Sequence, residues 1–351
     1  MLNENFLTLL RLAMGISDEL PGAMSTDEWQ QLHAMAYAQA LVGIMYQGVE
    51  KLPEEQRPPK DLMMTWYTER GYMMAKNRMM NQECVRLTEF FAKNGFRSCI
   101  LKGQGNTLMY RFPLLRQPGD IDIWVEGGQE RVVSFLKSKG LAYGLESYHH
   151  VDMRYKKGVS VEVHYRPSPG HYNPFTKKKL HRFLTGLSSE QFDNHVGLPE
   201  AEGTVSVPTV VFNRTYQLSH MFCHYLPVGV ELRHLMDYYY LLLQPSGDVA
   251  DEMARLKELG LYRFATAVMW VLGELFRLDR SKMVVEPDER LGRQLLENIT
   301  VEGASGKKLL EEQYSGVSYV LMRAKRMLKM ALNYPSDVWW WLFHSVRLRL
   351  P

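Results

Sequence analysis

The chain has 351 residues, of which 46% are hydrophobic and 23% are charged, and its formal net charge at pH 7 is +3. A chain of this length and composition can bury a sizeable core, which excludes a disordered or low-complexity protein. The nearly balanced charge argues against a dedicated duplex-binding protein, because such proteins concentrate basic residues on one face.

Residues 1–94 are predicted to form a helical N-terminal region. Apolar residues recur at helical spacing in two long segments, 29–47 and 62–94, and a proline-rich turn separates the segments. Many methionines between Met63 and Met80 follow the same spacing. Methionine is a flexible core residue, so we interpret these side chains as packing residues rather than as cofactor ligands.

Residues 95–205 are predicted to form an α/β core. A short apolar strand enters a helix through a glycine-containing turn, and a second strand and helix follow, with Gly140 closing that helix. Two further segments alternate between apolar and polar residues and meet at a Lys-Gly turn, which predicts an antiparallel hairpin. A polar connection that contains prolines comes next. The expected elements are strand 97–101, helix 104–110, strand 120–125, helix 129–139, and strands 150–156 and 159–166.

Residues 206–351 again show helical spacing and are predicted to form a helical C-terminal domain. The clearest helices are expected at 213–225, 231–243 and 316–333. The order of elements therefore predicts an α+β fold, in which a small mixed β-sheet core is flanked by N-terminal and C-terminal helical regions.

Three carboxylates are expected to converge in the core. Strand periodicity in the segment DIDIWV sends Asp120 and Asp122 to one face, and in VSVEVHYR it sends Glu162 outward beside His164. If the two strands are neighbours with their polar faces aligned, the three carboxylates meet and repel one another. A divalent cation relieves that repulsion, and oxygen ligands suit Mg²⁺ or Mn²⁺. Asp120, Asp122 and Glu162 are thus predicted to be metal ligands and catalytic residues.

The turn before these carboxylates is a candidate phosphate site. Gly103 allows the backbone to approach closely, and the following helix would point its free N–H groups at an anion. Lys102 adds a positive charge, and Arg116 could bind a phosphate through paired guanidinium hydrogen bonds. His164, which shares a face with Glu162, is predicted to contact the substrate or to support the metal ligands.

Four other histidines carry weaker signals. His149 and His150 begin a hairpin strand, so they are candidates for the same supporting role as His164. His220 and His224 lie one helical turn apart, a spacing that can hold zinc. No third ligand accompanies this pair in the sequence, so a structural role is preferred for it.

The segments LKGQGNTLMY, LLRQPGDIDIWV, HHVDMRY and VSVEVHYR together resemble the uncharacterised bacterial nucleotidyltransferase family of the polymerase-beta superfamily. The resemblance extends from about Cys99 to Arg166. It implies a nucleotidyltransferase-like core, a divalent metal ion and an NTP substrate. The implied reaction transfers a nucleoside monophosphate from the NTP to an acceptor and releases pyrophosphate.

The resemblance also assigns roles to individual residues. It places Gly103 and Gln104 on the phosphate-binding turn, Asp120 and Asp122 on the metal-binding pair, and Glu162 at the third acidic position. Gln104 stands where the superfamily usually has glycine or serine. All three acidic positions are filled, which is the pattern of an active member rather than of an inactive relative.

Three functions remain open from the sequence. The first is a nucleotidyltransferase that depends on Mg²⁺ or Mn²⁺ and modifies a hydroxyl of a small molecule or a protein. The second is a non-catalytic protein that binds a nucleotide or docks a partner on the same fold. The third, an RNA acceptor, is disfavoured by the nearly balanced charge, and strong salt dependence of RNA binding would support it.

The sequence predicts a cytoplasmic protein without a transmembrane segment. Its three cysteines, Cys84, Cys99 and Cys223, are widely separated and lack the spacing of a disulfide framework or a zinc site, so we interpret them as reduced core residues. Residues 338–343 form the most apolar run, far shorter than the roughly 20 residues that cross a bilayer. They are expected to pack on the protein as a helix, with contact with a membrane surface as the alternative.

Overall fold

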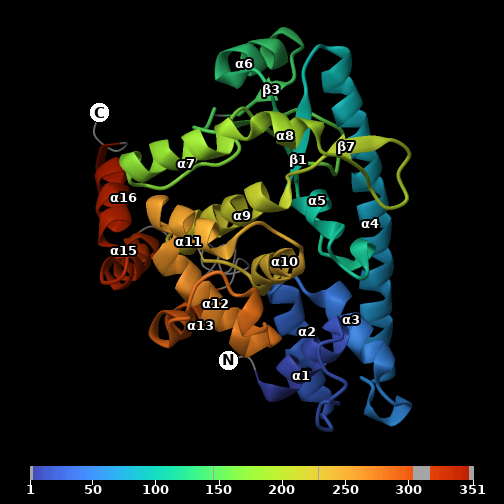
Figure 1. Cartoon of the computed structure of the whole chain (residues 1–351). Helices are drawn as coiled ribbons and strands as arrows, with labels where there is room; N and C mark the ends of the chain where they lie inside the picture. The colour runs from blue at the N-terminus through green and yellow to red at the C-terminus, as the bar shows by residue number, and fades with distance from the viewer. Residues whose placement is uncertain (1–2, 145, 228, 303–316, 348–351) are drawn as a thin grey trace. The chain divides into compact units, whose positions relative to one another are not determined.

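The structure is a computed structural model that describes residues 3–144, 146–227, 229–302 and 317–347 (Figure 1). The chain divides into two compact units. One unit contains the chain up to Pro167 together with Leu184–Asn213, and the other contains Ser168–Phe183 and the chain from Arg214 onward. The N-terminal helices therefore belong to the same unit as the sheet. The three-part division of the sequence stays a prediction.

The N-terminal helices are fixed by local signals. Asn3 caps the first helix by accepting a hydrogen bond from the backbone of Phe6, and Ser25 and Glu28 form a reciprocal capping box at the second. The helical stretch expected at 29–47 is interrupted at Ala40, whose φ of 56° lies in the left-handed region. The helices are α1 (Glu4–Met14), α2 (Thr26–Ala38), α3 (Val42–Lys51), the 3₁₀ turn η1 (Glu54–Gln56) and α4 (Lys60–Lys93).

A five-stranded mixed sheet forms the centre of this unit. The strand order is β1-β2-β5-β4-β3, in which only the β2–β5 pair is parallel. The hairpin expected from the alternating segments is confirmed as the antiparallel pair β4–β5, although both strands are shorter than predicted. The strands are β1 (Ser98–Leu101), β2 (Ile121–Val125), β3 (Ala142–Tyr143), β4 (His150–Met153) and β5 (Val161–His164).

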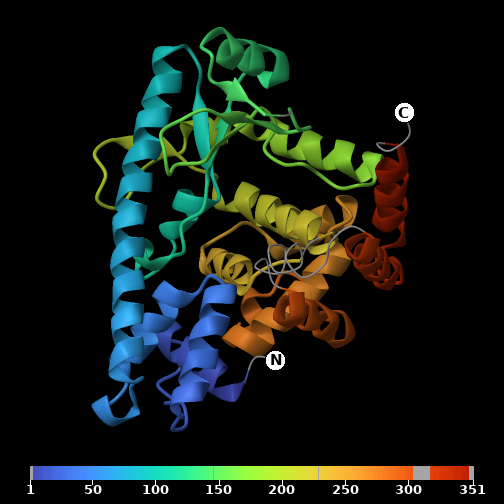
Figure 2. The same ribbon diagram turned by 180° about the vertical axis from the view of Figure 1, so that it is seen from behind.

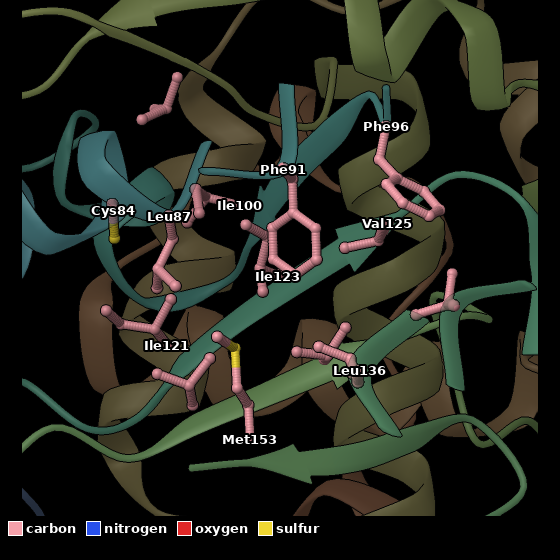
Figure 3. Close-up of a cluster of buried hydrophobic side chains, with 14 of the residues drawn as sticks. Cys84, Leu87, Phe91, Phe96, Ile100, Ile121, Ile123, Val125, Leu136 and Met153 are labelled. Carbon is pink, nitrogen blue, oxygen red and sulfur yellow. The ribbon is translucent and has the colours of Figure 1, made fainter. Parts of the chain in front are cut away.

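One face of the sheet is apolar and packs against two helices, α4 and α6 (Gly128–Ser138). Ile121, Ile123 and Val125 alternate along β2 and lie with Phe91 of α4 and Leu136 of α6 in one buried cluster (Figure 3). Helix α4 runs from the region of α3 to the sheet in both views of the molecule (Figures 1 and 2). The apolar positions of β2 are thus used by the core, which leaves its polar positions for the opposite face.

The rest of this unit consists of short elements. The polar connection after the hairpin contains helices and a small two-stranded sheet, β6–β7. The elements are α5 (Gly103–Thr107), η2 (Pro113–Leu115), α8 (Ser188–Asp193), β6 (His195–Gly197) and β7 (Thr204–Ser206), with α7 (Pro174–Gly186) and α9 (Val210–Tyr225) divided between the two units.

The second unit is helical throughout its described residues. The helices expected at 213–225, 231–243 and 316–333 are present as α9, α10 and α15. The aromatic run near the C-terminus lies in α16, where Val338 is buried and Trp340 contacts Phe175 of α7. No described helix combines the length and apolar character that a membrane span requires. The elements are α10 (Leu232–Leu243), α11 (Val249–Glu258), α12 (Tyr262–Phe276), η3 (Arg280–Lys282), α13 (Glu289–Glu302), α15 (Val317–Ala331) and α16 (Pro335–Arg347).

The predicted α+β class, with a small mixed sheet and flanking helices, is confirmed. The predicted cytoplasmic location stays a prediction, and contact of the C-terminal helix with a membrane surface stays the untested alternative. Cys84 and Cys99 are buried and Cys223 is partly buried, all as free thiols, in agreement with the interpretation of these residues as reduced.

Candidate metal centre

The polar face of the sheet gathers acidic and imidazole side chains from three adjacent strand segments. The parallel pairing of β2 and β5 places Asp122 directly opposite Glu162. The antiparallel pairing of β4 and β5 places His150 opposite His164 and Asp152 opposite Glu162. Opposed residues in a sheet project to the same side, so these five side chains share one face.

Asp122 is a buried carboxylate that contacts Lys102 and His164. It is 2% exposed, and its Oδ1 lies 2.8 Å from Lys102 Nζ and 2.9 Å from His164 Nε2. Burial opposes ionisation, but Lys102 and His164 outweigh it and hold the pKa of Asp122 well below its ordinary range. Asp122 is therefore an ionised group at neutral pH, as a cation ligand must be.

Glu162 lies next to Asp122 and between two histidines. Its Oε2 is 3.4 Å from His150 Nδ1 and 3.4 Å from His164 Nε2. Burial raises the pKa of Glu162, yet the bond from His164 outweighs burial and lowers it. Burial lowers the pKa of His164, and the bonds to Asp122 and Glu162 reverse that effect and raise it. The His164 ring thus contacts both carboxylates that the two strands bring to one buried place.

Asp120 lies immediately before β2 and is partly exposed. Repulsion from Asp122 and burial raise the pKa of Asp120, with a further contribution from Glu162. Asp122, Glu162 and His164 offer ligand atoms within 4.8 Å of one another, and the groups of this kind found among the described residues do not contain Asp120. The structure brings Asp122 and Glu162 together, with Asp120 within electrostatic reach of both.

Lys102 and Gly103 form the turn between β1 and α5 in unusual backbone conformations. Lys102 has φ 50° and ψ −141°, and Gly103 has φ 34°. A side chain at the Gly103 position would have room, at 3.5 Å from the backbone oxygen of Asp120, but would be strained by the positive φ. A non-glycine residue in such a conformation costs free energy that the surrounding fold must supply, and such residues cluster at ligand sites. This conformation places the Lys102 ammonium at Asp122.

The two remaining predicted phosphate ligands are tied to α4. The Gln104 side chain is 1% exposed and donates hydrogen bonds to the amide oxygens of Asn77 and Asn81. Its side chain is therefore turned toward α4, and only its backbone remains for the phosphate-binding turn. Arg116 is 4% exposed, and its backbone oxygen accepts a hydrogen bond from Asn77.

Two histidines at the start of β4, which carry only a weak signal in the sequence, join this cluster. His149 Nε2 lies 2.9 Å from His150 Nδ1, and the rings of His149 and His164 lie 5.2 Å apart. His150, Asp152 and Glu162 also offer ligand atoms within 4.8 Å of one another. The alternating segment HHVDM predicts that His150 and Asp152 share one face of their strand. Only the strand register shows that Glu162 lies on that same face.

Comparisons with known proteins give one family match. The model of a family described as uncharacterised nucleotidyltransferase matches residues 25–277, which is most of the chain. No curated protein matches it. One similar solved structure is an antigenic nucleotidyltransferase-like protein from Paracoccidioides brasiliensis, with 14% identity and a TM-score of 0.36, over 61% of this chain and 96% of that chain. A likeness of that size supports neither a fold nor an activity.

Proposed function

Because this chain belongs to the uncharacterised nucleotidyltransferase family, we propose that it transfers a nucleoside monophosphate from an NTP to a hydroxyl group of an acceptor. The acceptor is a small molecule or a protein side chain, and pyrophosphate is the second product. The observation that carries this proposal is the position of Asp122 directly opposite Glu162 on two parallel strands, with Lys102 at Asp122. The polymerase-beta superfamily and a bacterial origin stay predictions.

The donor set fits a divalent cation. Asp122 and Glu162 are ionised and mostly buried, and with His164 they offer ligand atoms within 4.8 Å of one another. In the proposal, Asp120, Asp122 and Glu162 hold Mg²⁺ or Mn²⁺, with Asp120 turned toward the other two. When bound, the cation lowers the pKa of the attacking hydroxyl and neutralises charge on the leaving pyrophosphate.

The other residues of the site bind and orient the NTP. Lys102 lies at the start of α5 with its ammonium 2.8 Å from Asp122, so the same ammonium is placed to bind a phosphate oxygen beside the carboxylates. Gly103 and the backbone of Gln104 form the turn that the triphosphate approaches. Arg116 is proposed as a further phosphate ligand because it lies on the segment that leads into Asp120.

The transfer itself is a displacement at the α-phosphorus. The acceptor oxygen forms a bond to that phosphorus, while the bond from the phosphorus to the bridging β-phosphate oxygen breaks. The electron pair of the broken bond leaves with pyrophosphate. The proton of the acceptor hydroxyl passes to Glu162, which is ionised and lies on the sheet face that the substrate would approach.

The reaction class is tested with nucleotides labelled on the α-phosphate. The full chain is incubated with each NTP, Mg²⁺ or Mn²⁺ and a metabolite extract, and both the protein and the extract are then analysed by mass spectrometry. We expect a mass gain of one nucleotide on an acceptor, with an equal amount of pyrophosphate. If NTPs raise the melting temperature but release no pyrophosphate with any extract, the chain is a nucleotide-binding protein without catalysis.

A further inference from the structure

Three imidazole rings converge beside Glu162 at the edge of the candidate metal centre. The ring centroids of His149, His150 and His164 lie 4.3, 5.2 and 5.3 Å apart, and each ring offers a nitrogen within 4.8 Å of the others. His150 and His164 oppose each other on β4 and β5, and His149 immediately precedes β4. Neither the nucleotide nor the hard cation of the proposed reaction requires three imidazoles.

The spacing of the ligand atoms fits a tetrahedral metal ion. Zinc–ligand distances of about 2.0–2.2 Å place neighbouring ligand atoms about 3.3–3.6 Å apart around a tetrahedron. Glu162 Oε2 is 3.4 Å from His150 Nδ1. His149 Nε2 and His150 Nδ1 are closer, at 2.9 Å, and a small rotation of the His149 ring opens that edge. The edge between Glu162 and His150 therefore already has the length that a tetrahedral ion requires.

The second nitrogen of two rings gives independent support. His149 Nδ1 lies 3.2 Å from Ser147 Oγ, an arrangement that orients a ring and is typical of metal-bound histidines. His164 is 1% exposed, its Nε2 contacts Asp122, and its Nδ1 has no hydrogen-bond partner among the described residues, so Nδ1 is the nitrogen left to bind a metal. A buried ring nitrogen without a partner is costly in a purely structural cluster.

The kind of side chain in the cluster also favours one class of metal. Imidazole ligands suit Zn²⁺ and similar transition metals, whereas Mg²⁺ prefers oxygen.

We propose that His149, His150, His164 and Glu162 bind a transition-metal cation of the Zn²⁺ class, at a position separate from the Mg²⁺ or Mn²⁺ of the proposed transfer reaction. The two positions share Glu162, and the inference rests on the proposed function only through that residue. A cation held by the histidines fixes the Glu162 carboxylate and adds positive charge on the side of the site away from Lys102.

The inference is tested with Co²⁺, which replaces Zn²⁺ and gives strong visible absorption bands when it is bound tetrahedrally by nitrogen. The full chain is stripped with a chelator, titrated with Co²⁺, and then challenged with Zn²⁺ or with excess Mg²⁺. We expect the bands to saturate at one Co²⁺ per chain, to disappear with Zn²⁺ and to persist with Mg²⁺. Bands that Mg²⁺ removes, or no bands at all, would overturn the inference.

Variants separate this site from adventitious binding. His149→Ala and His150→Gln should each weaken Co²⁺ binding about tenfold or more, while His195→Ala, which changes an exposed histidine of the same unit, should leave it unchanged. Circular dichroism verifies folding, and His150→Gln keeps a hydrogen-bonding side chain in case His149→Ala does not fold. Equal binding by all three variants contradicts the proposal.

Asp120→Asn distinguishes the two proposals. This variant should keep the Co²⁺ bands and lose nucleotide transfer. If the variant keeps both the Co²⁺ bands and nucleotide transfer, the role proposed for Asp120 is wrong, while the histidine site is supported. If it loses the bands, the histidines do not form a separate site, whatever the transfer activity.

Discussion

The Lys102 ammonium lies 2.8 Å from Oδ1 of Asp122, a carboxylate that is only 2% exposed. The lysine reaches this place from a backbone conformation with positive φ, at the end of β1 and the start of α5. Two features of the chain that lie twenty residues apart, the glycine-led turn and the acidic strand, are therefore joined by one buried ion pair. A buried carboxylate in this position needs a positive neighbour, which the fold supplies through Lys102.

Lys102→Met tests that ion pair through stability. Removing one member of a buried pair typically costs about 3–5 kcal/mol, and we expect the lower end of that range because His164 still contacts Asp122. Urea unfolding measures the loss. The double variant Lys102→Met/Asp122→Asn should recover most of it, because no uncompensated charge then remains. A double variant that is as unstable as the sum of the single variants would show that the two residues do not interact.

Glu83 gives a prediction about pH that is independent of the metal centre. It is buried in α4, where burial raises its pKa, but hydrogen bonds from Lys156 and Tyr155 outweigh burial and lower it. A lowered pKa contributes stability above the unfolded-state value of about 4.3, and that contribution is lost as the pH falls through the folded-state value. Glu83→Gln should therefore be less stable than wild type at pH 7, with the difference shrinking below about pH 4.

Urea unfolding at a series of pH values measures this difference. Glu89→Gln, on the same helix, is the matched control, because the ion pair of Glu89 with Lys93 is exposed. Its effect should stay within about 0.5 kcal/mol at any pH. A Glu83→Gln difference that does not change with pH would contradict the role given to its ionisation.

Alanine substitution at two helical glycines should change the free energy of unfolding in opposite directions. A Cβ at Gly43 of α3 would lie 2.4 Å from the backbone oxygen of Leu115 and 2.5 Å from Met73 Sδ, whereas a Cβ at Gly71 of α4 meets nothing within 4 Å. Gly43→Ala should cost about 1–3 kcal/mol through overpacking. Gly71→Ala should add about 0.5–1 kcal/mol through helix propensity. Thermal unfolding of both variants measures these changes. If Gly43→Ala leaves the stability unchanged, α3 and the segment at Leu115 pack less closely than described.

The strands of the site could be predicted from alternation alone, but their register could not. The patterns DIDIWV and VSVEVHYR identify β2 and β5 and their polar faces. Nothing in either pattern says that the strands pair in parallel with Asp122 opposite Glu162, because that register depends on the α6 crossover and on the packing of α4. For the same reason the approach of His149 and His150 to His164 is a property of the β4–β5 pairing rather than of the histidine spacing.

The positions of individual side chains differ from the sequence-based predictions where contacts with distant segments determine them. Gln104 was assigned to the phosphate turn by family resemblance, yet two asparagines of α4 bind its side chain. Those asparagines lie more than twenty residues earlier, so no local pattern reveals the contact. Asp120 follows the strand alternation in sequence but precedes the first paired residue of β2, which leaves its side chain outside the closest group of ligand atoms.

The central claim is that Asp122 and Glu162 act together in nucleotide transfer. The most direct measurement is pyrophosphate release with Mg²⁺ by Asp122→Asn, against Asp61→Asn, which changes an exposed residue in the first turn of α4. We expect Asp122→Asn to remain folded, because the substitution removes a charge without changing the size of the side chain, and to lose transfer by about a hundredfold or more. Asp61→Asn should keep wild-type activity. Full transfer by a folded Asp122→Asn protein would contradict the claim.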